Sequence, residues 1–238
     1  MVAGATAARP AGYHPAMPEI TLRSPAGNLR ARHDPPEAPG PAAGPRGALV
    51  CHPHPVQGGT MDNKVVVKLA QVLRRRGLHV LRFNFRGAGG SEGRHDEGRG
   101  ELDDARAGLE HLAGLVGGGP LLAAGFSFGS WVGLRAAAAD PRVCARLAVA
   151  PPVNHYDFAA VAADPTPLAV IYAEDDELVP ADAVRAWLAG RSPPPRAFPV
   201  AGAGHLFHAH LKDVAAAAEA WLDELACAGG EPPVHSAP

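Results

Sequence analysis

The sequence predicts a single α/β domain built on a mostly parallel sheet with helices on both faces. Short apolar segments alternate with segments of helical spacing from Ala48 to about Cys227. This alternation is typical of a doubly wound parallel sheet. The chain has 238 residues, a length that suits one such domain. We find neither an internal repeat nor a second break in composition.

The first part of the chain predicts a tail, a hairpin and a connection. Residues 1–17 are rich in Pro, Ala and Gly, like residues 229–238, so we expect disordered tails around a domain at 18–228. Residues 19–33 alternate apolar and polar on both sides of a central glycine, as in a hairpin. The proline-rich segment 34–47 predicts a connection, because proline cannot pair in a central strand.

From Ala48 onward the expected strands and helices alternate. The first helix has Thr60 as a candidate N-cap and Gly77 as its stop, and a later one has Pro180 near its start. We expect strands at 48–52, 78–85, 120–126, 145–152, 167–175 and 195–200, and helices at 60–77, 100–115, 128–139, 180–190 and 208–226.

Composition excludes several classes of protein. The formal net charge of −2 provides no strong field for nucleic acid or an anionic membrane. No run of about eighteen apolar residues is present, so we expect no membrane span. Cys51, Cys144 and Cys227 are widely spaced, which fits a reducing compartment. Since the N-terminus also lacks a signal-peptide pattern, we expect a cytoplasmic protein.

Three side chains that serve one kind of chemistry follow three different predicted strands. Ser127 comes after 120–126, Asp175 and Asp176 come at the end of the apolar run near 167–175, and His205 follows 195–200. In an open parallel sheet, ligands bind at the carboxyl ends of the strands. We therefore expect the serine, an acid and the histidine to lie at one edge.

These residue types suit nucleophilic catalysis. A serine hydroxyl becomes a good nucleophile when a neighbouring imidazole takes its proton. An acid on the other ring nitrogen holds the required tautomer. Gly125 and Gly129 would permit a sharp turn that exposes the Ser127 hydroxyl and places the N–H of Phe128 at a helix start, ready to stabilise an oxyanion.

The motifs resemble those of the α/β-hydrolases. The pattern G-x-S-x-G at 125–129 implies Ser127 as the nucleophile. The stretch "AEDDELVP" resembles the acid loop of the family and implies Asp176 rather than Asp175, and "GAGHLF" implies His205 as the base. The stretches "CHPHPVQGGTMDNKVV" and "FNFRGAGGSEG" are similar to those of a small subgroup of lidless bacterial serine hydrolases with esterase-like activity.

The resemblance covers the chain from about Glu19 to Cys227. It implies one α/β-hydrolase domain with about eight strands. The segment 151–167 between two strands is too short for a multi-helix cap, so no substantial cap is expected. By the same alignment His54 supplies the second oxyanion N–H. Pro55 cannot donate, and Val56 remains an alternative donor.

The remaining motifs indicate structural roles. His52 and His54 form an H-x-H pair without a third ligand at suitable spacing, so we expect neither a metal nor another cofactor. We expect His52 to make a local hydrogen bond that shapes its loop. The glycines around "GGT" do not have P-loop spacing. Arg86 is expected to brace neighbouring loops.

The function predicted from these residues is hydrolysis of carboxylic esters with small or exposed acyl groups, through an acyl-enzyme. The expected partner is a small-molecule ester. Two alternatives stay open: a peptidase or aminopeptidase on the same three residues, and a non-catalytic binding module on the same scaffold. The oligomeric state is not predicted.

Overall fold

A computed structural model describes residues 19–40, 44–138 and 140–227, so the expected tails at 1–17 and 229–238 lie outside the described residues. The strands are β1 (Glu19–Ser24), β2 (Gly27–Asp34), β3 (Gly47–Cys51), β4 (His79–Phe83), β5 (Leu121–Phe126), β6 (Val143–Val149), β7 (Leu168–Ala173) and β8 (Arg196–Val200). The helices are α1 (Lys64–Arg75), α2 (Arg99–Leu115), α3 (Phe128–Ala138), α4 (Ala159–Ala163), α5 (Ala181–Ala189) and α6 (Leu211–Cys227), with a short 3₁₀ helix, η1 (Pro55–Gln57).

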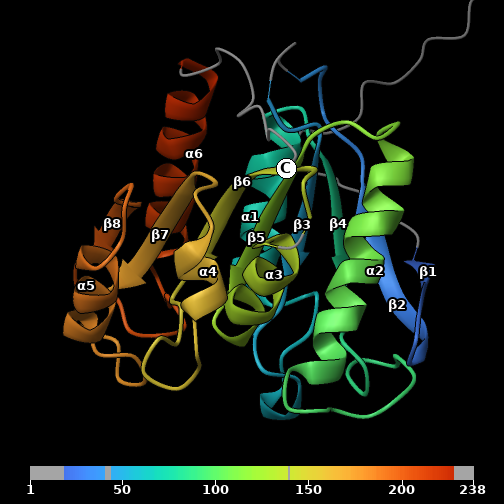
Figure 1. Cartoon of the computed structure of the whole chain (residues 1–238), viewed down its shortest axis with the longest axis horizontal. Helices are drawn as coiled ribbons and strands as arrows, with labels where there is room; N and C mark the ends of the chain where they lie inside the picture. The colour runs from blue at the N-terminus through green and yellow to red at the C-terminus, as the bar shows by residue number, and fades with distance from the viewer. Residues whose placement is uncertain (1–18, 41–43, 139, 228–238) are drawn as a thin grey trace, which may run out of the picture.

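The strands form one eight-stranded sheet in the order β1-β2-β4-β3-β5-β6-β7-β8 (Figure 1). The hairpin strands β1 and β2 are antiparallel to each other, and β2 is antiparallel to β4. All the other pairs are parallel. The predicted fold class, a single α/β domain on a mostly parallel sheet of about eight strands, is confirmed.

Helices cover both faces of the sheet because its strands are apolar on both sides. In β3, Leu49 and Cys51 pack into the core on the side of α2, α3 and α5, whereas Ala48 and Val50 pack into the core on the side of α1 and α6. Successive strand side chains point to opposite faces, so a fully apolar strand fills two separate cores. Figure 1 shows α2, α3 and α5 in front of the sheet and α6 behind it.

Helix α1 begins later than the sequence predicts. The expected N-cap, Thr60, instead lies in a turn, where its carbonyl accepts the N–H of Asn63 at 3.0 Å. Asn63 is the cap, since its side chain accepts the N–H of Val65 at 2.9 Å. A helix needs one such acceptor at its first turn, and asparagine is at least as good as threonine. The predicted stop is confirmed, because Gly77 has a φ of 86°.

The segment between β6 and β7 lies close to the sheet and forms no cap. Its one helix is the five-residue α4. The fully buried guanidinium of Arg146 in β6 donates to the carbonyls of Asp164 and Thr166 at 2.8 and 2.5 Å and pairs with the Asp164 carboxylate at 2.9 Å. Burial lowers the pKa of Arg146 to about 10, so it stays charged at neutral pH. This buried cation fixes the end of the segment, and the predicted absence of a cap is confirmed.

Across the described residues, every helix is too short or too polar to cross a bilayer.

Candidate active site

Ser127 stands on a sharp turn between β5 and α3. Its φ is 53°, a left-handed conformation that costs energy for a residue other than glycine. A side chain at Gly125 would collide with the backbone of Gly129 and Ser130, and one at Gly129 would collide with the carbonyl of His52. Glycines at both positions therefore let the backbone turn tightly enough to expose the Ser127 hydroxyl.

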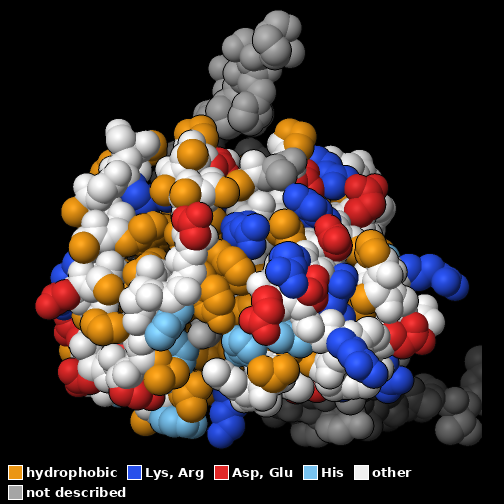
Figure 2. Space-filling model, turned by 60° about the horizontal axis from the view of Figure 1, so that its bottom comes forward, with side chains coloured by type: hydrophobic (Ala, Val, Ile, Leu, Met, Phe, Trp, Pro, Cys, Tyr) orange, Lys and Arg blue, Asp and Glu red, His pale blue; other side chains and the backbone are white. Residues whose placement is uncertain are grey.

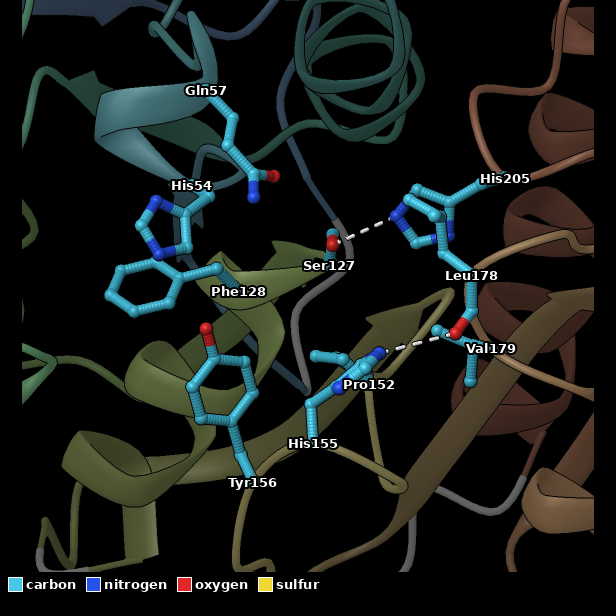
Figure 3. A pocket seen from close by; sticks show the side chains of 10 residues that line it. All are labelled: His54, Gln57, Ser127, Phe128, Pro152, His155, Tyr156, Leu178, Val179 and His205. Carbon is cyan, nitrogen blue, oxygen red and sulfur yellow. Dashed lines mark hydrogen bonds between the residues drawn. The ribbon is translucent and has the colours of Figure 1, made fainter.

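The structure brings Ser127, His205 and Asp176 together in one hydrogen-bonded row. The Ser127 Oγ lies 2.9 Å from Nε2 of His205 (Figure 3). The Nδ1 of His205 lies 2.8 Å from Oδ2 and 3.1 Å from Oδ1 of Asp176. A carboxylate can only accept, so Nδ1 carries the hydrogen and Nε2 is free to accept from the serine hydroxyl.

Asp176, rather than Asp175, faces the histidine. The Oδ1 of Asp176 also accepts the N–H groups of Leu178 and Val179 at 2.9 and 2.8 Å. These bonds lock the carboxylate at the end of β7, and the residue is buried. Asp175 is exposed. The choice of Asp176 over Asp175 that the sequence predicts therefore agrees with the geometry.

A further acid, Glu177, holds the loop that carries His205. Its carboxylate accepts the N–H of His205 at 3.0 Å. The ring of Phe126 packs beside the imidazole with a centroid distance of 5.5 Å. Sequence reasoning does not identify Glu177, because an acid next to Asp176 carries no motif of its own.

His54 and Phe128, the two predicted oxyanion donors, flank Ser127 in the same pocket. Their rings are 4.8 Å apart, and the ring of His95 packs against both, at 4.8 Å from His54 and 5.8 Å from Phe128. Burial lowers the pKa of His54, and the neighbouring His95 lowers it further. His54 is therefore neutral at pH 7. The Val56 side chain is exposed and does not line the pocket.

His52 joins the ends of two neighbouring strands. Its Nδ1 donates to the Pro53 carbonyl at 2.6 Å, and its Nε2 accepts the N–H of Phe85 at 2.9 Å. Burial lowers the pKa of His52 to about 4. The predicted local hydrogen bond is confirmed. Within the three described ranges, no group of three or more His, Cys, Asp or Glu side chains could hold a metal ion.

Two buried acids at the start of α2 brace the loop after β4. Asp104 accepts from the Arg86 guanidinium at 2.8 and 3.0 Å and from its backbone N–H at 3.0 Å, which confirms the predicted bracing role of Arg86. Glu101 is fully buried and accepts from Nδ1 of His95 at 2.7 Å and from the N–H of Gly98 at 2.9 Å. This fixes the ring that packs beneath His54 and Phe128.

The hydroxyl of Ser127 opens into a pocket of about 410 Å³ (Figure 3). Among the described residues, no aspartate, glutamate, lysine or arginine lines it. The lining residues are His54, Gln57, Ser127, Phe128, Pro152, His155, Tyr156, Leu178, Val179 and His205. Sequence reasoning assigns no role to Tyr156, which belongs to no motif, or to Gln57, although Gln57 lies within the stretch "CHPHPVQGGTMDNKVV". The arrangement offers a nucleophile and base beside a mostly apolar cavity.

Comparisons with known proteins agree with this geometry. The family model described as alpha/beta hydrolase fold matches residues 56–168. An uncharacterized protein of Rickettsia prowazekii is 39% identical over 173 residues, which are 71% of this chain and 71% of that protein. Two solved bacterial structures are also similar over most of their length.

The first of these structures is an alpha-beta serine hydrolase homologue from Coxiella burnetii. It is 34% identical with a TM-score of 0.81, over 89% of this chain and 100% of that chain. The second, from Xanthomonas campestris, is described as an a/b serine hydrolase without a lid. It is 38% identical with a TM-score of 0.80, over 89% of this chain and 96% of that chain.

Proposed function

The chain belongs to the α/β-hydrolase family, with lidless bacterial serine hydrolase homologues as close structural neighbours, and from this premise we propose that it is a serine esterase. The observation that carries the proposal is the unbroken row from the Ser127 hydroxyl through the His205 imidazole to the Asp176 carboxylate. All three residues project from loops at the carboxyl ends of parallel strands, where such sheets bind ligands.

In the first half of the reaction, the Ser127 Oγ attacks the carbonyl carbon of the ester while its proton passes to Nε2 of His205. Asp176 stabilises the imidazolium that forms. When the tetrahedral intermediate collapses, the bond to the alcohol oxygen breaks and His205 returns the proton to the leaving alcohol. The acyl group is then attached to Ser127.

In the second half, His205 takes a proton from water, whose oxygen attacks the carbonyl carbon of the acyl-enzyme. When this intermediate collapses, the bond to the Ser127 Oγ breaks, His205 returns the proton to Oγ, and the carboxylic acid leaves. The negative charge on the carbonyl oxygen develops twice, once in each half. The N–H of Phe128 at the start of α3 and the N–H of His54 are the proposed donors to it, and the positive end of the helix dipole adds to the first.

The lining of the pocket favours neutral ester substrates over aminopeptidase substrates. An aminopeptidase must bind the charged amino group at the end of its substrate, which requires an anionic partner. Of the residues that the structure describes, no carboxylate lines the pocket, and burial lowers the pKa of His54, which favours its neutral form. An uncharged small-molecule ester fits this lining without leaving a charge unpaired.

A fluorophosphonate probe with peptide mapping tests the proposal. We expect the wild-type protein to be labelled at Ser127 and to hydrolyse p-nitrophenyl acetate. Ser127→Ala should lose the label and about 10⁴-fold or more in turnover. Ser130→Ala is the matched control, because this serine lies one turn further along α3 and its Oγ donates to the Ser127 carbonyl rather than to His205.

An unlabelled wild-type protein, or a Ser127→Ala variant with full esterase activity, contradicts the assignment. Faster cleavage of aminoacyl anilides than of the corresponding aryl esters contradicts the preference for esters.

A further inference from the structure

Exposed large hydrophobic side chains gather around one site on this molecule. Four such side chains occur among the described residues: Val56, Leu178, Leu206 and Leu115, with 69%, 50%, 47% and 41% of their surface exposed. Leu178 lines the pocket that contains Ser127, Val56 stands directly before the lining residue Gln57, and Leu206 directly follows His205. We call Val56, Leu178 and Leu206 the apolar rim.

The apolar rim comes from three loops at the same edge of the sheet. Val56 lies in η1 after β3, Leu178 follows β7, and Leu206 follows β8. Figure 2 turns the bottom of Figure 1 forward, and on that face histidine side chains lie next to hydrophobic ones, with acidic and basic side chains also close by. Leu178 lines the pocket, and Val56 and Leu206 stand on other loops at the same edge of the sheet, next in sequence to the lining residues Gln57 and His205.

The backbone at each rim position is held by hydrogen bonds or by buried neighbours. The N–H of Leu178 donates to Asp176, and its carbonyl accepts from Asn154 at 3.0 Å. The same carbonyl accepts from His155 at 3.2 Å (Figure 3). Leu206 lies between His205, whose N–H is held by Glu177, and the fully buried Phe207. Val56 lies between buried Pro55 and Gln57, whose N–H bonds to the His54 carbonyl.

We propose that the apolar rim binds an apolar chain of the ester substrate, so that the enzyme prefers medium-chain esters to acetates. The inference rests on the proposed esterase function and names its substrate class. No acidic, lysine or arginine side chain of the described part of the chain lines the pocket, and each methylene that leaves water adds about a fourfold gain in binding. Three side chains are too few for a stable protein–protein contact, which needs about 800 Å² on each partner.

Chain-length selectivity in single variants tests the proposal. Two ester series are compared in the wild type, all below their micellar concentrations. In at least one of them kcat/KM should rise with chain length: it should be higher for p-nitrophenyl octanoate than for p-nitrophenyl acetate, or higher for octyl acetate than for ethyl acetate. The first series varies the acyl chain, and the second varies the alcohol chain. In the series whose chain binds the apolar rim, Leu178→Ser should lower the ratio of kcat/KM for the long ester to that for the short ester by about tenfold. Val56→Ser and Leu206→Ser should each lower the same ratio about threefold or more.

Leu115→Ser is the matched control. Leu115 is also an exposed leucine, but it is the last residue of the 17-residue α2. This helix begins near the pocket, and its rise places Leu115 about 25 Å away along its axis. The Leu115→Ser variant should therefore have the same long-to-short kcat/KM ratios as the wild type. The proposal is overturned if the rim variants have the same long-to-short kcat/KM ratios as Leu115→Ser in both series.

A binding measurement separates this proposal from the esterase function. Ser127→Ala cannot turn over an ester, so n-octanol can be titrated into it and followed by amide NMR shifts. We expect saturable binding that Leu178→Ser weakens about tenfold and Leu115→Ser leaves unchanged. Absence of saturable binding overturns the apolar rim as a chain site, whether or not the protein hydrolyses esters. A wild type that fails to react with fluorophosphonate, yet binds octanol in this way, overturns only the esterase function.

Discussion

Asp176 illustrates how one side chain is given a single orientation. Its carboxylate accepts two backbone N–H groups from its own loop and the Nδ1–H of His205. The backbone bonds stabilise the charged form and fix the orientation of the carboxylate. The Asp176 side chain is therefore already in the rotamer that bonds to the imidazole. Asp175 is one residue earlier, beyond the end of β7 at Ala173, and is exposed.

The pair Asp176→Asn and Asp175→Asn separates the two acids. An amide at 176 presents a donor as well as an acceptor and no longer enforces the tautomer in which Nε2 accepts from Ser127. We expect Asp176→Asn to lower kcat for p-nitrophenyl acetate by about 10³- to 10⁴-fold. Asp175→Asn should remain within about twofold of the wild type. Equal losses in the two variants, or a larger loss at 175, would show that the acid is wrongly assigned.

Motif residues were predictable from the sequence, whereas the residues that support them were not. Ser127, Asp176 and His205 could be identified because each follows a strand and keeps a recognisable spacing. Glu177 holds the loop of His205 and Tyr156 lines the pocket because of how their loops fold, and no local sequence pattern encodes that folding. Their positions depend on where the 151–167 segment and the β7 loop meet, which is a tertiary property.

At the scale of elements, the carboxyl ends of β3 and β4 are joined by the His52 imidazole. Its two ring nitrogens bond to the Pro53 carbonyl and the Phe85 N–H. The same loop carries His54 beside the pocket. The ring is buried, and its pKa is lowered to about 4. The hydrogen bonds at these strand ends therefore depend on a neutral histidine.

This histidine makes stability depend on pH. In the unfolded chain a histidine titrates near pH 6.5, whereas burial lowers the pKa of folded His52 to about 4. Between these values the unfolded state binds the proton and the folded state does not. The free energy of unfolding therefore falls as the pH falls from about 6.5 to about 4, by at most about 3 kcal/mol.

His52→Gln tests this contribution, because glutamine keeps a hydrogen-bonding side chain and does not titrate. At pH 7.5 we expect the variant to be less stable by about 1–3 kcal/mol, from the altered hydrogen bonds and packing. Near pH 4.5 the gap should shrink, because the wild type loses stability that the variant never had. Urea unfolding followed by circular dichroism measures both values.

The exposed His208 offers the control. His208→Gln should follow the wild type within about 0.5 kcal/mol at both pH values. A His52→Gln gap that stays constant from pH 7.5 to 4.5 would contradict a neutral buried imidazole at 52.

Most helices and strands could also be predicted from the periodicity of apolar residues. Where the structure differs from the prediction, the difference has a physical cause. The start of α1 was placed at Thr60 because threonine is a good cap, yet Asn63 has the acceptor that bonds to the first turn. The short α4 was not predicted, because a five-residue helix has too few turns for an apolar period. Its place depends on the distant Arg146, which bonds to the Val161 carbonyl within it.

At the scale of the whole molecule, the absence of a cap decides how substrate arrives. The segment between β6 and β7 is bound down by Arg146, and the loops after β3, β7 and β8 line the pocket without covering it. No described element stands over Ser127 that would have to move before an ester could reach it. We therefore expect binding to proceed without a conformational opening step.

The expected consequence is hydrolysis without interfacial activation. An enzyme with an apolar lid gains activity when a lipid surface holds the lid open, so its rate rises steeply where the substrate forms micelles. Here the rate on a p-nitrophenyl ester should follow ordinary saturation up to the critical micelle concentration and level off beyond it, because only the dissolved ester reaches the pocket. Initial rates across that concentration, with and without a detergent at submicellar level, provide the measurement. A steep rise at the micellar threshold would mean that a segment covers Ser127 in solution and must be displaced before substrate binds, which is incompatible with a fixed, open pocket.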